Sequence, residues 1–304
     1  MASPENPRIS ICVPVYNGEA FLSQALDSIL AQTYRDYELL ISDNASTDST
    51  AEICRHYAAR DPRIQYSRNA VNIGANPNFN RLIQLARAPY FKLANADDLC
   101  APELLARCVT VLDRHPEVVL CYARTRLIDA TGRVLRDYDD NLDLRLPSAV
   151  ARFMAVNERL GLVNVLHGVI RTDVLRKTSC LGSYAGADTL LVMELALRGQ
   201  FNEVPDRLFF RRMHDTAASS LKRLDEQQMF VNPQVRPAHT MRIWRQHRGY
   251  VSAIARTPLS LLERLALCGW VIRSFVWHRK SLGRELANLV RFSLGRVLSR
   301  EKAA

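Results

Sequence analysis

The chain has 304 residues, 48% of them hydrophobic and 24% charged, which is typical of a globular protein with one large domain and an appendage, or with two modest domains. Its net charge of +10 is unevenly distributed. Residues 236–304 contain 14 of the 41 basic and 3 of the 31 acidic residues, a net charge of +11, which leaves −1 for residues 1–235. A neutral main body argues against a nucleic-acid enzyme, so we expect no nucleic-acid partner.

The opening residues MASPENPRIS lack a basic segment followed by an apolar run, so we expect a cytoplasmic protein. Seven cysteines without a CxxC pair predict free thiols and no structural zinc site.

The first hundred residues alternate between apolar runs and helical repeats. The predicted helices cover about 19–32, 47–60 and 76–86, and the predicted strands are Arg8–Val15, Tyr37–Ser42, Arg63–Ser67 and Tyr90–Ala94. This order predicts an α/β fold with a mostly parallel sheet and helices on both faces. Ligands of such sheets bind beyond the carboxyl ends of the strands. Polar residues follow three of these ends: Tyr16-Asn17, Asp43-Asn44 and Asp97-Asp98.

The middle of the chain is predicted to continue with mixed elements. We expect an acidic, mobile loop over Tyr138–Arg145. The predicted helices are Pro102–Arg114, Ser148–Leu160 and Asp188–Arg198, and the predicted strands are Glu117–Ile128, Arg133–Asp137, Val165–Ile170 and Asn202–Arg211.

The basic tail is predicted to form three helices, over about 241–255, 258–280 and 282–299. We divide the chain into a main domain, 1–220, and this helical extension, 221–304. Charged residues at positions 263, 264 and 273 interrupt the apolar middle helix, which argues against a membrane span. An interfacial helix on an anionic membrane is favoured, with Trp270, Phe275 and Trp277 among the headgroups. The alternative is a helical cap packed on the main domain.

Several polar residues have a functional and a structural interpretation. Asp97-Asp98 could hold a divalent cation or cap a helix, and Asp43 could contact a nucleotide or form a turn. Asp188 could act as a general base or as a helix N-cap. His214 could be a ligand or an ordinary surface histidine.

Four segments decide between these interpretations: ISICVPVYNGEAFLSQALDSILAQTY, YELLISDNASTDST, NIGANPNFNRLIQLA and PYFKLANADD. In this order they resemble the family 2 glycosyltransferases, whose nucleotide-binding domain has the Rossmann-like GT-A fold. GAD at 186–188 and RRMH at 211–214 extend the resemblance to about 215 residues. It implies an inverting, non-processive transferase for a UDP- or dTDP-sugar, serving bacterial-type cell-surface polysaccharide or glycolipid assembly.

The resemblance also implies roles for single residues. Asp97 and His214 would bind Mn²⁺ or Mg²⁺, and Asp188 would be the catalytic base. The implied donor-binding residues are Pro14, Val15, Tyr16, Asp43, Asn72, Gly74, Asn95 and Asp98. The acceptor would be a saccharide or a lipid-linked molecule. We expect His167, Arg171 and the acidic loop to shape the acceptor site.

Departures from the family pattern keep alternatives open. Asn95 stands where many relatives have an acidic residue, and Ala187 replaces a glutamate common before the base. A non-catalytic binding protein of the same fold is therefore the main rival. A sugar nucleotidyltransferase is less favoured, because PVYNGEAF after the first strand contains no basic residue. The QxxRW motif of polysaccharide synthases is absent, and MRIW at 241–244 does not supply it.

Overall fold

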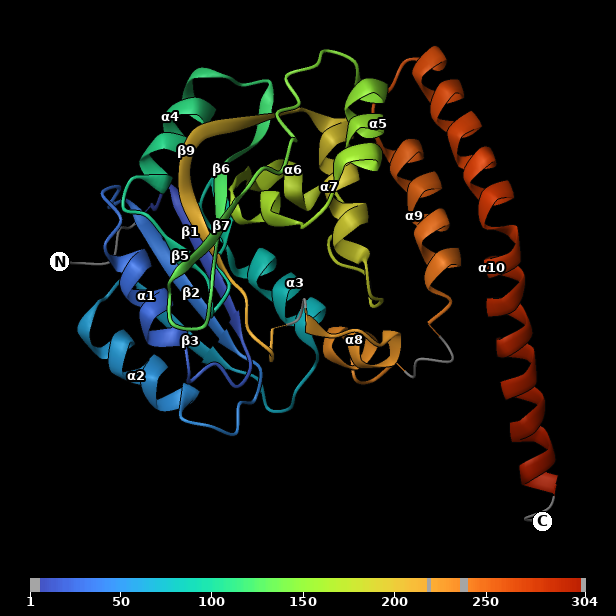
Figure 1. The fold of residues 1–304 in the computed structure, drawn as a ribbon, viewed down its shortest axis with the longest axis horizontal. Helices are drawn as coiled ribbons and strands as arrows, with labels where there is room; N and C mark the ends of the chain where they lie inside the picture. The colour runs from blue at the N-terminus through green and yellow to red at the C-terminus, as the bar shows by residue number, and fades with distance from the viewer. Residues whose placement is uncertain (1–5, 218–219, 236–239, 302–304) are drawn as a thin grey trace.

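A nine-stranded sheet forms the centre of the protein, which is described by a computed structural model for residues 6–217, 220–235 and 240–301 (Figure 1). The strand order is β3-β2-β1-β4-β8-β6-β9-β5, and β7 pairs with β6. One half is parallel and comprises β1 (Ile9–Val15), β2 (Tyr37–Asp43), β3 (Ile64–Arg68) and β4 (Tyr90–Leu93). Residues of β1 and β2 are almost all buried, because helices cover both faces.

The other half of the sheet is mixed. β8 (Val169–Arg171) runs antiparallel to both β4 and β6 (Val118–Ile128). β9 (Gln200–Arg212) runs parallel to β6. β7 (Val134–Tyr138) pairs antiparallel with β6, and β5 (Leu99–Cys100) pairs antiparallel with β9. The predicted α/β sheet is confirmed, with its parallel part concentrated in the first four strands.

Helices cover the two faces and bury two apolar cores. One core includes residues of α1 (Leu22–Leu30), α2 (Thr50–Arg60) and α4 (Leu104–Arg114). The other includes residues of α3 (Ala75–Leu85), α5 (Ala149–Arg159), α6 (Thr172–Arg176), α7 (Ala187–Arg198) and α9 (Arg242–Arg256). Short elements complete the fold: the 3-10 helix η1 (Asn164–His167) and α8 (Leu224–Val231).

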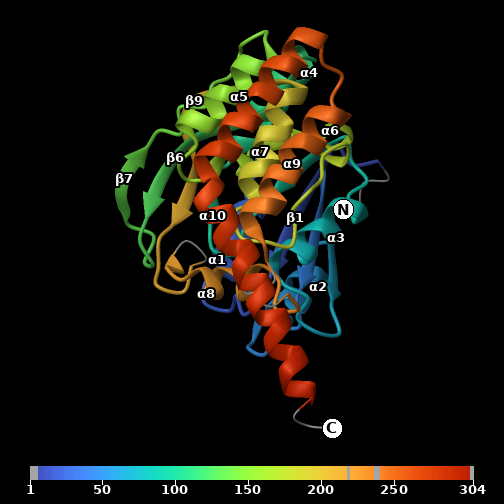
Figure 2. The same ribbon diagram turned by 90° about the vertical axis from the view of Figure 1, so that its right-hand side faces the viewer.

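The tail differs from its prediction in one respect. The two expected helices after residue 257 form one continuous helix, α10 (Leu261–Glu301), which extends past the other helices (Figure 2). Leu267 and Val271 of α10 are buried in the core that α9 also joins. Trp270 and Phe275 are partly buried and pack against Phe153 and Trp244, and their contact with lipid headgroups stays a prediction. The division at residue 220 stays a prediction.

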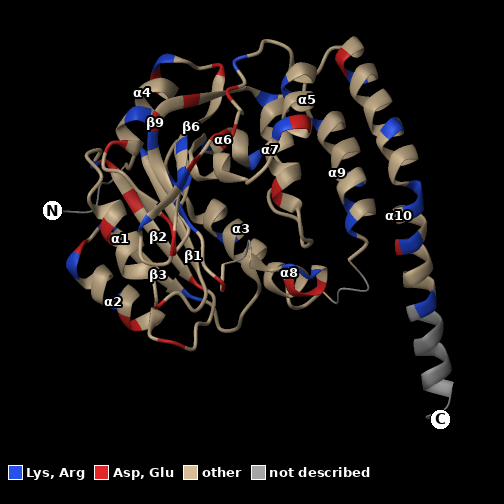
Figure 3. Ribbon diagram, in the orientation of Figure 1, with Lys and Arg blue, Asp and Glu red and all other residues tan. Residues whose placement is uncertain are grey.

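Lys and Arg residues are spread along α9 and the described part of α10 (Figure 3). Alongside them, α10 exposes large apolar side chains: Leu261, Leu262, Leu265, Ile272, Val276, Trp277, Leu286 and Val290. Among the helices of the described residues, none has the length and apolar character needed to cross a membrane.

The expected acidic loop over 138–145 is packed against the sheet. Leu142 and Leu144 are fully buried, and Leu144 forms a bridge with Phe201 of β9. The carboxylate of Asp140 is buried too and accepts a hydrogen bond from Thr125 Oγ1 at 2.9 Å. The aspartates predicted a solvated loop, but the alternating leucines hold the segment against the protein.

Candidate active site

The carboxyl end of β2 places Asp43 in a fully buried turn. Its Oδ1 accepts the backbone N–H of Ser46 at 2.8 Å, and its Oδ2 accepts the Tyr66 hydroxyl at 2.9 Å. The Arg68 Nε lies 3.6 Å from the same Oδ2. The turn interpretation of Asp43 is therefore confirmed, and its contact with a nucleobase stays a prediction.

Asn72 and Gly74 belong to the same end of the sheet. Asn72 Oδ1 accepts hydrogen bonds from Asn44 Nδ2 and from the Gly74 N–H, both at 2.8 Å. Asn44 N in turn donates to the carbonyl of Val15. Gly74 has a φ of +91°, and a Cβ there would lie 2.5 Å from the Val231 carbonyl oxygen. The backbone itself thus requires glycine at this position.

The chain after β1 turns sharply beside this group. Val15 is buried, Pro14 is partly exposed, and Tyr16 is 46% exposed. Asn17 has a φ of +50°, and its Oδ1 accepts the backbone N–H of Thr47 at 2.8 Å. Thr47 therefore joins two strand ends, and α2 begins only at Thr50. The exposed Tyr16 ring is free to contact a ligand beyond the sheet.

The segment after β4 brings together four of the predicted site residues. Asp97 Oδ2 lies 3.0 Å from His214 Nε2, and Asp98 Oδ2 accepts a hydrogen bond from Asn95 Nδ2 at 2.9 Å. Asp98 Oδ1 accepts the Arg212 N–H at 2.8 Å. Both Asp98 oxygens are thus engaged within the protein, whereas the Asp97 carboxylate has, among the described residues, only His214 as a side-chain partner.

Burial, and next the charge of Asp97, raise the pKa of Asp98 to about 7. Arg212 holds this segment from the other side and is itself fully buried. Its guanidinium donates to the carbonyl of Asp97 and to Gln24 Oε1, both at 2.8 Å, and its charged carbon lies 4.7 Å from the Phe21 ring centre. Arg212 is therefore a positioning residue for the two aspartates.

Asp97 and His214 suit a divalent cation held jointly with a substrate. A carboxylate oxygen and an imidazole nitrogen are acceptable ligands for Mn²⁺, and these two atoms already converge. In the described part of the chain, no group of three or more His, Cys, Asp or Glu side chains is arranged to hold a metal. Mg²⁺ and Mn²⁺ commonly complete such sites with water and substrate phosphates.

Asp188 occupies the first turn of α7, after Gly186 with a φ of +87°. Its Oδ1 accepts the neighbouring N–H of Thr189 at 2.9 Å. Burial raises the pKa of this carboxyl, and the Arg211 guanidinium acts in the opposite direction. A raised pKa suits a group that must take up a proton from a hydroxyl.

Arg211 and Asn164 were not assigned from the sequence, although RRMH was noted. Neighbouring residues of a strand point to opposite faces, so Arg211 faces away from the buried Arg212. Arg211 Nη1 donates to Asn164 Oδ1 at 2.7 Å. The Arg211 charge opposes the rise in pKa that burial causes at Asp98, Asp140 and Asp188, and it adds to the fall in the pKa of His167. Its positive charge therefore acts on both the metal motif and the predicted base.

His167 lies beside the metal motif, as the sequence suggested for the acceptor site. Its Nε2 is 3.4 Å from Asn95 Nδ2, and its ring stacks on Phe209 with centres 4.9 Å apart. Burial lowers the pKa of His167 well below 6.5, so the ring is neutral. The buried Lys92 fixes this turn by donating from Nζ to the His167 carbonyl at 2.5 Å.

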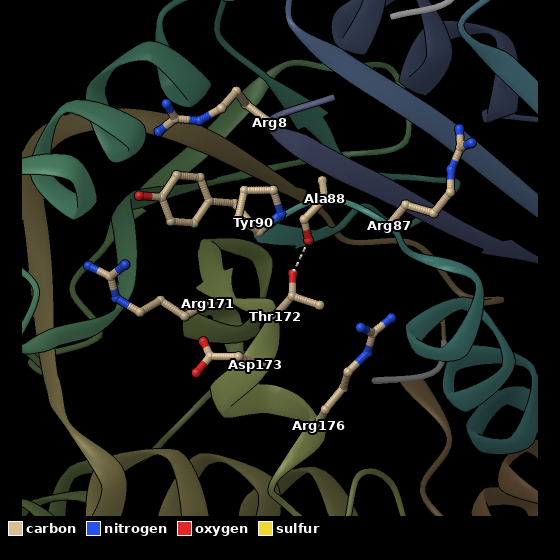
Figure 4. Close-up of a pocket in the computed structure, with 9 residues that line it drawn as sticks. Arg8, Arg87, Ala88, Tyr90, Arg171, Thr172, Asp173 and Arg176 are labelled. Carbon is tan, nitrogen blue, oxygen red and sulfur yellow. Dashed lines mark hydrogen bonds between the residues drawn. The ribbon is translucent and has the colours of Figure 1, made fainter. Parts of the chain in front are cut away.

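Arg171, by contrast, lies away from the site. It lines a cavity of about 680 Å³ beside Tyr90, at the start of β4, whereas Asp97 follows the other end of that strand (Figure 4). Arg171 donates to the carbonyls of Leu112 and Val118. The arginines of this cavity point in different directions, and the others are also engaged: Arg8 with Asp113, Arg87 with Glu38, and Arg176 with the end of α3. They stabilise the fold and do not converge on a ligand.

Comparison with known proteins gives a consistent assignment. The sequence model of the family described as Glycosyl transferase family 2 matches residues 10–171. The abequosyltransferase RfbV of Salmonella typhimurium is 39% identical over 116 residues, which are 37% of this chain and 35% of RfbV. The chain spans less than half the length of the curated relatives it matches first.

Two solved structures share the fold. S. aureus TarS 1-349 in complex with UDP has a TM-score of 0.63 at 16% identity, covering 90% of this chain and 73% of TarS. The mannosyltransferase PcManGT from Pyrobaculum calidifontis, in complex with GDP-Man and Mn²⁺, has a TM-score of 0.52 at 16% identity. That match covers 98% of this chain and 89% of PcManGT.

Proposed function

This chain belongs to glycosyl transferase family 2, and from that membership we propose that it transfers a single sugar from a nucleoside-diphosphate sugar to an acceptor hydroxyl, with inversion at the anomeric carbon. A UDP- or dTDP-sugar is the favoured donor. The observation that carries the proposal is the Asp97–His214 pair, 3.0 Å apart, on the same side of the sheet as the Asp43 turn.

The nucleoside would bind where the first two parallel strands end. Tyr16 offers an exposed ring for the base, and Pro14 and Val15 form the wall beneath it. The buried Asp43 would accept an N–H of the base, since a carboxylate oxygen can accept more than one hydrogen bond. Asn72, Gly74 and Asn95 supply polar groups for the base and ribose.

Asp97 and His214 would hold Mn²⁺ or Mg²⁺ against the diphosphate. A bound cation would stabilise the negative charge that develops on the leaving diphosphate. Asp98 and the buried Arg212 orient Asp97 through the contacts described above. Asp98 would also reach the transferred sugar.

Asp188 would accept the proton of the acceptor hydroxyl as that oxygen attacks the anomeric carbon. A single direct displacement inverts the anomeric centre and needs no covalent intermediate. The raised pKa of Asp188 supports the role of base, and Thr189 N orients one of its oxygens. The acceptor would be a saccharide or a lipid-linked saccharide of a cell-surface polysaccharide or glycolipid.

The tail would bring the protein to the cytoplasmic face of an anionic membrane. Trp277 is 82% exposed and Ile272 is 64% exposed on α10, close to Arg273, Arg279 and Lys280. An apolar stripe flanked by basic side chains fits an interfacial helix better than a solvated one.

The test is incubation with a panel of UDP- and dTDP-sugars in the presence of Mn²⁺, followed by nucleoside diphosphate release. NMR of the freshly released sugar gives its anomeric configuration. We expect slow release of the inverted sugar from one donor, with water replacing the acceptor. Release of the retained anomer would contradict the direct displacement.

A further inference from the structure

Arg211 has hydrogen-bonding capacity that the protein does not use. A guanidinium has five N–H donors. Arg211 donates from Nη1 to Asn164 Oδ1 at 2.7 Å. Among the described residues, no other hydrogen-bond acceptor contacts its guanidinium. No described carboxylate lies within ion-pair distance of it either. The side chain is partly exposed, so the remaining donors are open to a ligand.

The group is nevertheless held in place. Asn164 is fixed in the buried turn of η1, with 2% of its surface exposed. The backbone of β9 is anchored by the next residue, since the Arg212 N–H donates to Asp98. A fixed guanidinium with open donors loses little entropy on binding and matches a phosphate with two parallel hydrogen bonds.

We propose that Arg211 binds a phosphate group of a substrate, with Asn164 as its positioning residue. The proposal rests on the proposed function for the identity of the substrate. Two sources supply the same chemistry: the diphosphate of the donor, and a phosphate on the acceptor. Arg211 precedes Arg212, whose N–H binds Asp98. Its partner Asn164 belongs to η1, whose last residue, His167, lies 3.4 Å from Asn95 of the metal motif.

The experiment compares wild type with Arg211→Gln, Arg211→Lys and a control, Arg207→Gln. Arg207 is on the same strand, but its guanidinium is engaged by Asp137 and Asp139. Binding of inorganic phosphate without metal is measured by ³¹P NMR, and binding of UDP with Mn²⁺ by calorimetry. Thermal melting shows whether each variant folds, and Arg211→Lys keeps the charge if Arg211→Gln does not fold.

We expect Arg211→Gln to bind inorganic phosphate about tenfold or more weakly, because hydrogen bonds to a charged group are lost. Arg211→Lys should lose part of the affinity, and Arg207→Gln none. If the UDP affinity of Arg211→Gln falls by the same factor, Arg211 binds the donor diphosphate. If the UDP affinity is unchanged, Arg211 binds a phosphate of the acceptor. Phosphate binding that is absent in wild type, or equal in wild type and Arg211→Gln, would overturn the proposal. If phosphate binding depends on Arg211 but no nucleotide sugar is turned over, the proposed transferase function fails and the phosphate site stands.

Discussion

His214 Nε2 lies 3.0 Å from Asp97 Oδ2, although 117 residues separate the two in the chain. The contact joins the segment after β4 to the segment after β9. The Asp97 carbonyl is held by Arg212, and the His214 ring packs on Phe21 with its Nδ1 2.9 Å from Thr216 Oγ1. In the proposed function, these two side chains bind a cation together with the substrate.

His214→Ala should lower metal-dependent donor turnover by about tenfold or more, since stabilisation of the leaving group is weakened. Turnover is measured against Mn²⁺ concentration, and the variant should need more metal to reach half of its maximal rate. His115→Ala, an exposed histidine paired with Glu117, is the control. An unchanged metal dependence would remove His214 from the metal site.

Asp188→Asn should reduce transfer by a factor of about 10² to 10⁴ while donor affinity stays nearly unchanged, because only proton removal is lost. Calorimetry with the donor and a transfer assay on the same preparation separate the two effects. Asp173→Asn, an exposed aspartate of α6, serves as the matched control. Lost donor binding in Asp188→Asn would show instead that Asp188 is structural or contacts the donor.

Asp140 should make the stability of the protein depend on pH. Its folded pKa is raised by burial to about 7 from 3.8, so the protonated form is favoured in the folded state. The contribution of Asp140 to the free energy of unfolding should therefore be largest below pH 3.8 and fall as the pH rises toward about 7.

Asp140→Asn should reduce the fall in the free energy of unfolding between about pH 5 and about pH 8 by about 1–4 kcal/mol. Urea unfolding at both pH values measures it. If the variant and wild type lose equal stability over this range, Asp140 is charged in the folded protein.

Gly74→Ala should destabilise the protein by about 1–3 kcal/mol, because the new Cβ meets the Val231 carbonyl and the backbone has a positive φ. Nucleotide affinity should fall as well, since Gly74 N contacts Asn72. Gly283→Ala in α10 is the control, with no atom within 4 Å of its Cβ position. Similar melting temperatures for both variants would contradict the packing described for Gly74.

Trp277→Glu should weaken binding to vesicles of phosphatidylcholine and phosphatidylserine by about tenfold or more. The change replaces an exposed apolar side chain with a negative charge, which the anionic lipid repels. Val134→Glu, on the exposed strand β7, should have no effect. Cosedimentation measures both. If the wild-type protein does not bind anionic vesicles, the membrane proposal is wrong and α10 is only a helical cap on the main domain.

The strand ends of the first half were predictable because buried parallel strands are continuous apolar runs and their polar ends stand out. Asp43, Asp97 and Asp98 were found in this way. Arg211 was not, since adjacent arginines look alike in a sequence. Only the alternation of side chains along β9, together with the position of Asn164, separates the buried Arg212 from the open Arg211.

The tail shows a second limit. A break was expected at residue 281, between the second and third predicted helices, but α10 continues through it and through Gly283. One glycine costs a helix only about 1 kcal/mol, which flanking helix formers offset. Trp270 was expected among the lipid headgroups, and the structure adds that its partly buried ring packs on Phe153 and Tyr250. Tertiary contacts decide such faces, and composition does not reveal them.

The central claim is metal-dependent use of a nucleotide sugar at Asp97. The most direct measurement is binding and slow hydrolysis of a panel of nucleotide sugars, with and without Mn²⁺ or Mg²⁺, by wild type and Asp97→Ala. We expect one UDP- or dTDP-sugar to be hydrolysed by wild type only with metal, and this activity to be lost in Asp97→Ala. If no donor shows metal-dependent binding or turnover in wild type, the claim is contradicted and a non-catalytic binding protein becomes the better account.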